Sequence, residues 1–355
     1  MLLLRRAVLA WMICQGILLG ACAQPAAAPA KPAAAPPAGQ AAPTAPAAAP
    51  AAAAQPPAAA PAAALPRLRV AYVSPVGAMA PLWMAQESGA FERAGVPVEV
   101  RYIQANAAVP ALLAGEVELL EISGPAVLSA ALQGADLTFI AGGLNAMILN
   151  LHAAADVHAA ADLRGKLVGT DRPGTPVAFG ADVALQRLGV KPDDVQLLNV
   201  GSADNQIAAL LAGQLSASIL GPPQSFVAES AGYPLLVDLH DVPYQNVGVV
   251  ARRERLNELA PSLVPFLRAY REGIERYDAD KPFALTVLQK YSQENDPDIL
   301  DKTYEFYHRL GFTRDLAVSD AGLTSILGFL SEVVPEAKSA QPSQFYDARF
   351  LQQLP

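Results

Sequence analysis

The sequence is poor in cysteine, and both cysteines, Cys14 and Cys22, lie near its start. The rest of the chain therefore has no disulfide framework, no thiol nucleophile and no thiolate metal site. Histidine is also scarce, and no two of the four histidines have the spacing of metal ligands: His152, His158, His240 and His308. We therefore predict neither a metal site nor a cofactor.

Acidic residues are absent from residues 1–66, where the bases are Arg5, Arg6 and Lys31. The arginine pair precedes an apolar run, residues 7–19, which is shorter than the roughly 20 residues of a membrane-spanning helix. This pattern predicts a signal peptide at residues 1–21. The run ends in Leu-Gly-Ala-Cys and resembles the lipobox of bacterial lipoproteins, which implies a lipid on Cys22 and an extracytoplasmic, membrane-anchored protein. The alternative is an ordinary signal peptide with an incidental cysteine.

Charged residues remain nearly absent up to residue 66, and the segment 22–66 is rich in alanine and proline. Frequent proline prevents a continuous helix and favours extended, solvated backbone. We interpret this segment as a tether, which would span on the order of 100 Å if fully extended and about 40 Å as a flexible coil.

A basic surface stripe is missing from the remaining body, residues 67–355. Without the three leader bases, 22 of the 25 bases face all 33 acids, which leaves about 11 net negative charges. Nucleic acid is therefore not expected as a partner. The body is long enough for two lobes, and we expect a monomer.

A duplicated stretch organises this body. Residues 111–125 and 209–223 both begin with Ala-Leu-Leu-Ala-Gly, continue with a short apolar run and end in a Gly/Pro loop. The glycines, Gly115 and Gly213, are typical helix-ending residues, and the apolar runs predict buried strands. Chance recurrence in an alanine-rich chain is the alternative.

Strands alternate with helices before and after each copy, which predicts an α/β protein with mostly parallel, doubly wound sheets. The C-terminal third is expected to be helical. Pro261 is interpreted as a first-turn proline, Asp296 as a cap before Pro297, and Ser319 or Asp320 as the start of a last helix. One apolar face of the first of these helices is marked by Leu263, Leu267, Tyr270, Ile274 and Tyr277.

The body resembles the substrate-binding proteins of bacterial ABC importers, in the NMT1/THI5-like and sulfonate/nitrate-binding group. The resemblance is carried by residues 68–77, 112–118, 122–126 and, most specifically, Asp-Leu-Arg-Gly-Lys at 162–166. It implies a type II periplasmic-binding-protein fold, in which two α/β lobes joined by two crossovers close on a solute. Lobe 1 would comprise residues 67–154 and 247–355, and lobe 2 residues 155–246.

Ligands of such sheets lie at the carboxyl ends of the strands, and the predicted contacts come from the loops there. In lobe 1 these are Ser74, Gly77, Met79, Trp83, Ser123, Gly124 and Asn145. In lobe 2 and at the second crossover they are Arg172, Gly174, Thr175, Gly221, Pro222 and Asn246. Helix capping for Ser74, Ser123 and Thr175, core packing for Trp83 and a solvated position for Arg172 are the alternatives.

These features predict a solute-binding lipoprotein that delivers a sulfonate, carboxylate or pyrimidine-like compound to an ABC permease and its ATPase. A receptor for a membrane sensor is one alternative. An enzyme on the same fold is another, but its candidate loops contain only Asp171 and Asp204 as carboxylates, so we predict no catalysis.

Overall fold

A computed structural model describes residues 65–355, and these residues belong to one compact unit. The predicted signal peptide, the lipidation site at Cys22 and nearly all of the tether lie outside the described residues.

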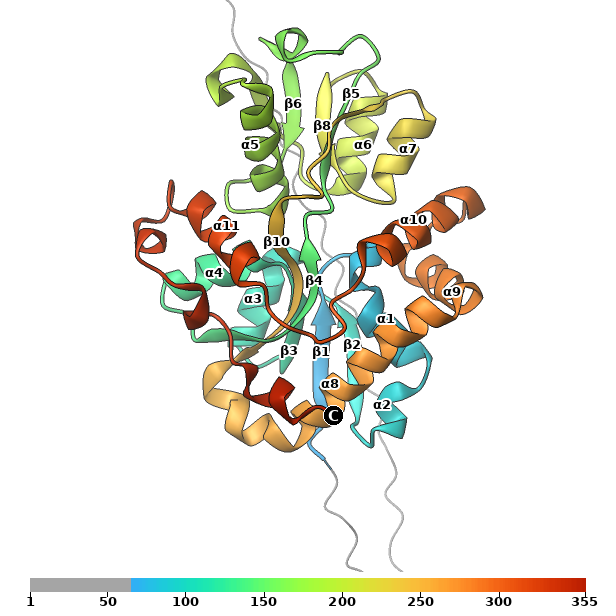
Figure 1. Cartoon of the computed structure of the whole chain (residues 1–355), viewed down its shortest axis with the longest axis vertical. Helices are drawn as coiled ribbons and strands as arrows, with labels where there is room; N and C mark the ends of the chain where they lie inside the picture. The colour runs from blue at the N-terminus through green and yellow to red at the C-terminus, as the bar shows by residue number, and fades with distance from the viewer. Residues whose placement is uncertain (1–64) are drawn as a thin grey trace, which may run out of the picture. The chain divides into compact units, whose positions relative to one another are not determined.

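The described residues form two five-stranded mixed sheets, which confirms the predicted α/β class (Figure 1). The first sheet has the order β2-β1-β3-β10-β4. Its strands are β1 (Leu68–Tyr72), β2 (Val98–Tyr102), β3 (Leu119–Ile122), β4 (Leu137–Ala146) and β10 (Pro243–Arg252). Strand β1 is parallel to β2 and β3, whereas β10 is antiparallel to both of its neighbours. We call this sheet with its helices lobe 1.

The second sheet, with its helices, is lobe 2 and has the order β7-β6-β8-β5-β9. Its strands are β5 (Asn150–Ala153), β6 (Leu167–Thr170), β7 (Gln196–Asn199), β8 (Ala217–Leu220) and β9 (Leu235–Val237). The chain crosses between the sheets at residues 147–149 and returns at residues 238–242. The sequence boundaries put residues 150–154 in lobe 1, whereas β5 pairs with β8 and β9 of lobe 2.

Helices cover the faces of both sheets. Those of lobe 1 are α1 (Ala80–Glu87), α2 (Ala90–Arg93), α3 (Ala105–Leu113) and α4 (Gly124–Leu132), and those of lobe 2 are α5 (Pro176–Leu188), α6 (Ala203–Leu211) and α7 (Gln224–Ser230). The 3-10 turns are η1 (Gly77–Met79), η2 (Ala160–Leu163), η3 (Pro192–Asp194), η4 (Arg253–Arg255), η5 (Pro335–Lys338), η6 (Pro342–Gln344) and η7 (Ala348–Gln353).

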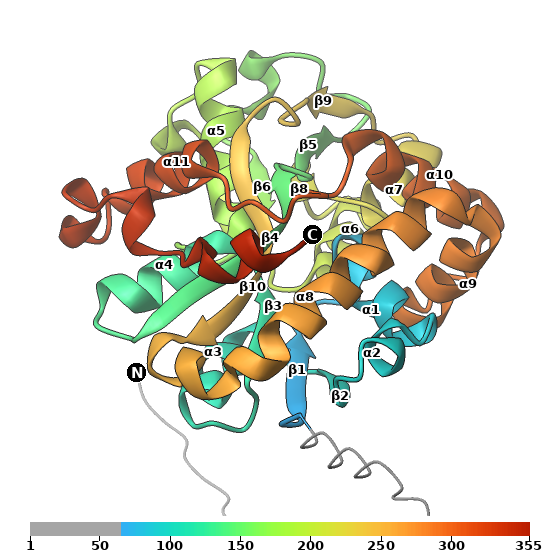
Figure 2. The same ribbon diagram turned by 60° about the horizontal axis from the view of Figure 1, so that its bottom comes forward.

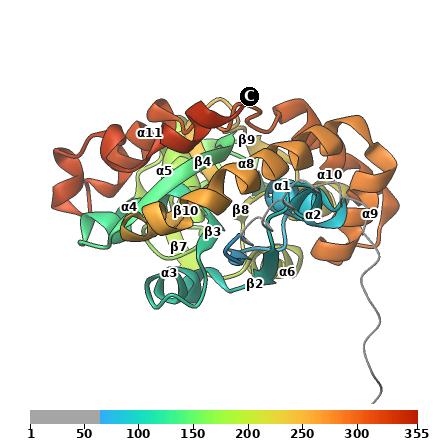
Figure 3. The same cartoon turned by 90° about the horizontal axis from the view of Figure 1, so that it is seen from below.

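The C-terminal third is helical, as predicted, with α8 (Leu256–Ala279), α9 (Lys281–Ser292), α10 (Pro297–Leu310) and α11 (Asp320–Leu330). Helix α8 lies beside α1 and α2 (Figure 2), whereas α11 lies beside α4 on the other side of the lobe 1 sheet (Figure 3). The side chains of Asp296 and Ser319 cap α10 and α11, and the five marked apolar residues of α8 are buried.

The predicted first-turn role of Pro261 is wrong. Helix α8 begins at Leu256, so Pro261 and Pro265 both lie inside it. The helix can form because its apolar side chains pack against lobe 1, and this burial compensates for the two missing backbone donors.

Both copies of the duplicated stretch fold alike. In each, an α-helix ends before a glycine with a left-handed backbone, Gly115 at φ 73° and Gly213 at φ 69°, and a buried strand follows. The backbone pairing repeats as well, because Glu118 N donates to Arg69 O and Ser216 N donates to Leu167 O, each at 2.9 Å. The repeat is therefore structural and not a chance recurrence.

Candidate functional site

The predicted contact loops lie at the carboxyl ends of parallel strands. Because β1 and β3 are parallel, the Ser74 loop and the Ser123 loop leave the same edge of the lobe 1 sheet. Because β6 and β8 are parallel, the Gly174 and Gly221 loops leave one edge of the lobe 2 sheet. Each lobe thus contributes one pair of loops.

One loop of lobe 2 reaches the first crossover, and one loop of lobe 1 reaches the start of β10. A Cβ atom on Gly221 would lie 3.1 Å from Ile148 O, so the Gly221-Pro222 loop of lobe 2 abuts the first crossover. A Cβ atom on Gly124 would lie 3.0 Å from Gln245 O, so the Ser123-Gly124 loop of lobe 1 abuts the start of β10. The backbone thus tolerates little more than glycine at these two contacts.

Asn145 and Asn246 lie on adjacent strands near the point where the chain leaves lobe 1, because Val247 pairs with Leu144. Asn145 Nδ2 donates to Ala317 O at 2.9 Å. Asn246 is buried in β10. Both predicted amides therefore lie at the junction of the lobes.

Two C-terminal helices of lobe 1 contact lobe 2 beside the crossovers. The Phe329 ring of α11 lies 5.3 Å from the Phe179 ring of α5, and Phe179 also packs against Tyr244 at 4.9 Å. On α10, the Phe306 ring lies 6.1 Å from the Phe226 ring of α7. The C-terminal helices therefore contact lobe 2 as well as lobe 1.

Three buried polar atoms at this junction have no hydrogen-bond partner within residues 65–355: Thr170 Oγ1, Tyr244 Oη and Asn145 Oδ1. Thr170 ends β6, Asn145 lies near the end of β4, and Tyr244 lies at the start of β10. Burial raises the pKa of Tyr244 well above its ordinary value, so its hydroxyl is neutral. Buried polar atoms are ordinarily paired, so each of these atoms calls for a bound partner or water.

Thr175 and Ser123 of the predicted loops differ in their roles. Thr175 Oγ1 accepts from Ala178 N at 3.2 Å and donates to Arg172 O at 2.9 Å, so it caps α5. Ser123 forms no side-chain cap to α4 in the described part of the chain. Helix α4 therefore begins at Gly124 with backbone amides that no capping side chain accepts from.

Other predicted residues lie inside lobe 1. Trp83 is fully buried, stacked on Tyr291 at 4.8 Å and edge-on to Tyr72 at 5.4 Å. Met79 and Gly77 are also buried, and the Tyr307 ring of α10 packs directly against Gly77. A ligand contact by Trp83 would require its neighbouring rings to move.

Arg172 is exposed and lies 3.8 Å from Asp171 Oδ1. Asp204 accepts from Gln224 Nε2 at 3.0 Å at the surface. Neither loop carboxylate is therefore buried.

A buried acid that sequence reasoning missed lies in β3, two residues before Ser123. Glu121 Oε1 accepts from Tyr270 Oη at 2.6 Å, and both side chains are fully buried. Burial raises the pKa of Glu121 well above its ordinary value, although the Tyr270 hydroxyl lowers it in part. Burial therefore favours the protonated form of this carboxyl. A glutamate within an apolar run was the available signal in the sequence.

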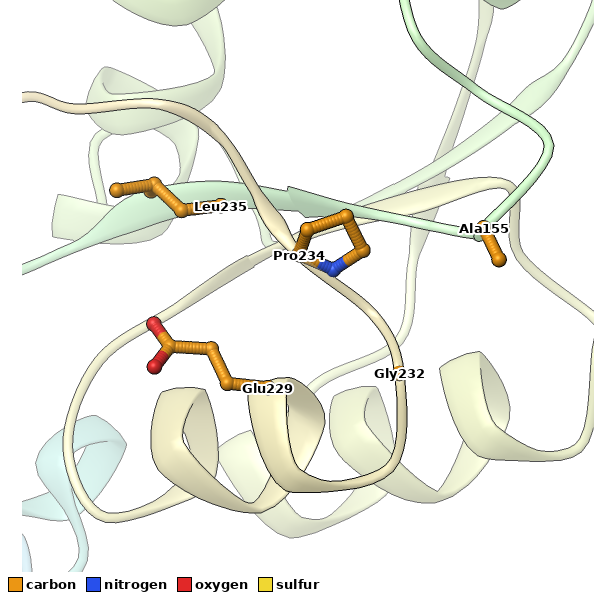
Figure 4. A pocket seen from close by; sticks show the side chains of 5 residues that line it. All are labelled: Ala155, Glu229, Gly232, Pro234 and Leu235. Carbon is orange, nitrogen blue, oxygen red and sulfur yellow. The ribbon is translucent and has the colours of Figure 1, made fainter.

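A hollow of about 640 Å³ lies elsewhere on lobe 2 (Figure 4). It is lined by Ala155, Glu229, Gly232, Pro234 and Leu235. Because Ala153 pairs with Ala217 at the start of β8, this hollow lies at the opposite end of that strand from Gly221. We place the candidate site at the junction of the lobes, beside the first crossover and the start of β10.

Residues 65–355 contain no group of three or more His, Cys, Asp and Glu side chains placed to hold a metal ion. Over the same residues, no helix has both the length and the apolar character needed to cross a bilayer.

Several solved structures share this architecture. The ligand-binding component of an ABC-type import system from Staphylococcus aureus, with zinc bound, aligns with a TM-score of 0.68 at 13% identity, covering 81% of this chain and 99% of that one. The alkanesulfonate-binding protein SsuA from Xanthomonas axonopodis pv. citri, bound to MOPS, aligns at 0.66 and 16%, covering 81% and 100%. A DszB mutant in complex with biphenyl-2-sulfinic acid aligns at 0.64 and 16%, covering 81% and 97%.

Two lobes, two crossovers and a shared junction define the periplasmic-binding-protein fold. The family model described as NMT1/THI5 like matches residues 77–282, more than half of the sequence. The chain belongs to this family. No curated protein matches it.

Proposed function

We propose that the protein is the extracytoplasmic solute-binding component of an ABC importer. Its two lobes would close on a small organic solute or anion and present it to a membrane permease and its ATPase. The family and the fold support a binding role. The observation that carries the proposal is that three strands with an end at the junction each bear a buried polar atom without a partner in the described residues: Thr170 Oγ1, Tyr244 Oη and Asn145 Oδ1.

The chemistry of this junction favours a sulfonate, a carboxylate or a pyrimidine-like head group. Hydroxyl groups and the free amide of Gly124 at the start of α4 are suited to oxygen acceptors of a solute. The other predicted contacts would approach the solute through glycine-bearing loops. Closure would follow from the solute binding both lobes at once, which stabilises the closed state over the open one.

The anchor and the tether are part of the proposal and rest on the sequence. A lipid on Cys22 would hold the body at the membrane surface, and residues 23–66 would let it travel between capturing a solute and reaching the permease. The protein would act as a monomer.

A melting-temperature screen tests the binding role. The full chain would be unfolded and refolded to remove any carried-over solute, and then heated with alkanesulfonates, short and aromatic carboxylates, nitrate and pyrimidines. A solute at about 100 times its dissociation constant adds roughly 2.7 kcal/mol of stability. We expect a saturable rise in melting temperature with one class, and recovery of the compound unchanged. Chemical conversion of the compound, or no response to any class, would contradict the proposal.

Thr170→Val tests the site. Because the hydroxyl has no partner in the described structure, its removal should not lower the stability of the solute-free protein. Solute affinity should fall about tenfold, equivalent to about 1.4 kcal/mol. The matched control is Thr138→Val, the same change at a fully buried threonine of β4, which should leave affinity unchanged. Equal affinities for both variants would remove Thr170 from the site.

A further inference from the structure

One amide side chain connects the two crossovers. Asn150, the first residue of β5, follows the first crossover directly and is buried. Its Oδ1 accepts from Leu239 N at 2.8 Å, and its Nδ2 lies 3.0 Å from His240 Nε2. Leu239 and His240 belong to the second crossover, residues 238–242. Asn150 therefore holds the two connections between the lobes together.

These contacts define which tautomer a neutral His240 ring adopts. The Leu239 amide can only donate, so it must face the oxygen of Asn150, and the NH2 group of Asn150 then faces His240. An NH2 group also only donates, so His240 Nε2 must present a lone pair. The proton of the neutral ring therefore lies on Nδ1, which is 2.9 Å from Asp238 Oδ1. The hydrogen-bond pattern requires the neutral Nδ1–H tautomer.

Charged groups of both signs surround this ring. On its own loop, Asp238 and Asp241 are exposed, and Arg187 of α5 donates to Asp238 O at 2.7 Å and pairs with Asp241 Oδ1 at 2.8 Å. Arg309 of α10 lines a hollow of about 280 Å³ together with His240, Phe306 and Leu310. From β5, the neighbouring titratable group is the buried His152, whose pKa is lowered by burial first and in part by His240. From α10, the uncharged Phe306 ring faces His240, and the centroids of the two rings are 5.0 Å apart.

Protonation would oppose two donors. A proton on Nε2 would point at the NH2 group of Asn150, and Asn150 could turn its oxygen to His240 only by releasing the Leu239 amide. The attraction gained by the exposed Asp238 is weak in water, whereas a buried donor without an acceptor is costly. The hydrogen bond between Asn150 and His240 is therefore incompatible with a charged ring.

We propose that Asn150 and His240 form a proton-sensitive tie across the hinge, intact while His240 is neutral and released when it is protonated. The consequence for solute capture rests on the proposed function: acidification would loosen the hinge and disfavour the closed state. Asn150 is here a positioning residue, because it acts through the crossovers and not through contact with a solute.

The tie can be tested without any solute, by NMR of the full chain. Nitrogen-15 shifts of the four histidines report tautomers directly, and we expect His240 as Nδ1–H at about pH 8. On acidification to about pH 5.5, the hydrogen-exchange protection factor of the Leu239 amide should fall about tenfold, and the cross-peak between the Phe226 and Phe306 rings should weaken. An Nε2–H tautomer, or unchanged protection of Leu239, would overturn the proposal.

Asn150→Asp sharpens the test because a carboxylate can accept from both the Leu239 amide and a protonated His240. Protection of Leu239 should then persist or rise on acidification, opposite to the native chain. His240→Phe keeps a ring against Phe306 and removes the titration, so the protection of Leu239 should no longer depend on protonation. If the protection of the Leu239 amide fell on acidification in His240→Phe as it does in the native chain, the proposal would be contradicted, even if Asn150→Asp failed to fold. Failure of the solute screen would leave these results unchanged, so the two proposals fail separately.

Discussion

The two lobes contain the same structural unit but differ at the outer strands. Equivalent register positions hold charged residues in lobe 1 and neutral residues in lobe 2: Arg69, Glu99 and Arg101 correspond to Leu167, Gln196 and Leu198. In lobe 1 these charges pair with one another or with Glu118. In lobe 2, Leu167 is 36% exposed and Leu198 43% exposed. The unit therefore depends on its inward-facing residues, whereas its outer edge can be charged or apolar.

The lobes also differ in their cores. The main hydrophobic core extends through lobe 1 and part of lobe 2, whereas a separate small cluster lies under α6 and α7. The small cluster consists of Ile207, Leu210, Leu215, Leu220 and Ala228. The same Ala-Leu-Leu-Ala-Gly stretch therefore packs into a large core in one copy and a small one in the other.

The largest expected effect compares the same leucine in both copies. Leu112 and Leu210 are both fully buried, the first in the main core and the second in the small cluster. We expect Leu112→Ala to lower the free energy of unfolding by about 3–5 kcal/mol and Leu210→Ala by about 2–3 kcal/mol, because the smaller cluster can relax more. Calorimetric unfolding of both variants measures the difference. A greater loss for Leu210→Ala would break the comparison.

A smaller effect concerns Glu121, which occupies the position of Ile219 in lobe 2. Burial raises the pKa of Glu121 in the folded protein, so above the ordinary glutamate pKa the unfolded chain loses a proton that the folded chain keeps. The native protein is thus penalised as pH rises through that range. Glu121→Gln should raise the free energy of unfolding by on the order of 1–3 kcal/mol at pH 7, and the gain should disappear near pH 4.

Denaturant titrations at the two pH values measure this gain. The exposed Glu92→Gln is the control for the loss of one carboxylate. A gain that is equal at both pH values would mean that Glu121 does not titrate differently in the two states.

The smallest effect exchanges the outer edges. Leu198→Arg gives lobe 2 the residue of lobe 1, and Arg101→Leu does the reverse. Both should change the free energy of unfolding by no more than about 0.5 kcal/mol, since both side chains are partly exposed. Light scattering against concentration should show less self-association for Leu198→Arg and more for Arg101→Leu, because charge on an edge strand opposes pairing. The same behaviour in both variants would show that edge charge is irrelevant here.

Local patterns predicted the parts of the fold that depend on local chemistry. The glycines after the two Ala/Leu helices have left-handed backbones, and Asp296 and Ser319 cap their helices. The predicted start of α8 is wrong because packing with distant residues lets the helix tolerate its two internal prolines. The sequence does not indicate which sheet β5 joins, because a short apolar run does not identify the strand with which it pairs.

The candidate site was predictable only in outline. The loops followed from strand ends, but the roles of their residues depend on long-range contacts. Tyr307 packs against Gly77 from a helix far along the chain, and Trp83 is enclosed by Tyr72 and Tyr291. Asn150 and His240 are 90 residues apart in the sequence, and no local spacing indicates such a contact.

The strand order also has a consequence for the sequence of events during synthesis. All strands of lobe 2 come from one continuous stretch, residues 150–237, whereas lobe 1 needs β10, which separates β3 from β4 in its sheet. Synthesis proceeds from the N-terminus, so all strands of lobe 2 are made before β10. At that stage β4 of lobe 1 still lacks β10, its neighbour in the sheet. A chain that stops before residue 243 would therefore retain the complete second sheet and an interrupted first one.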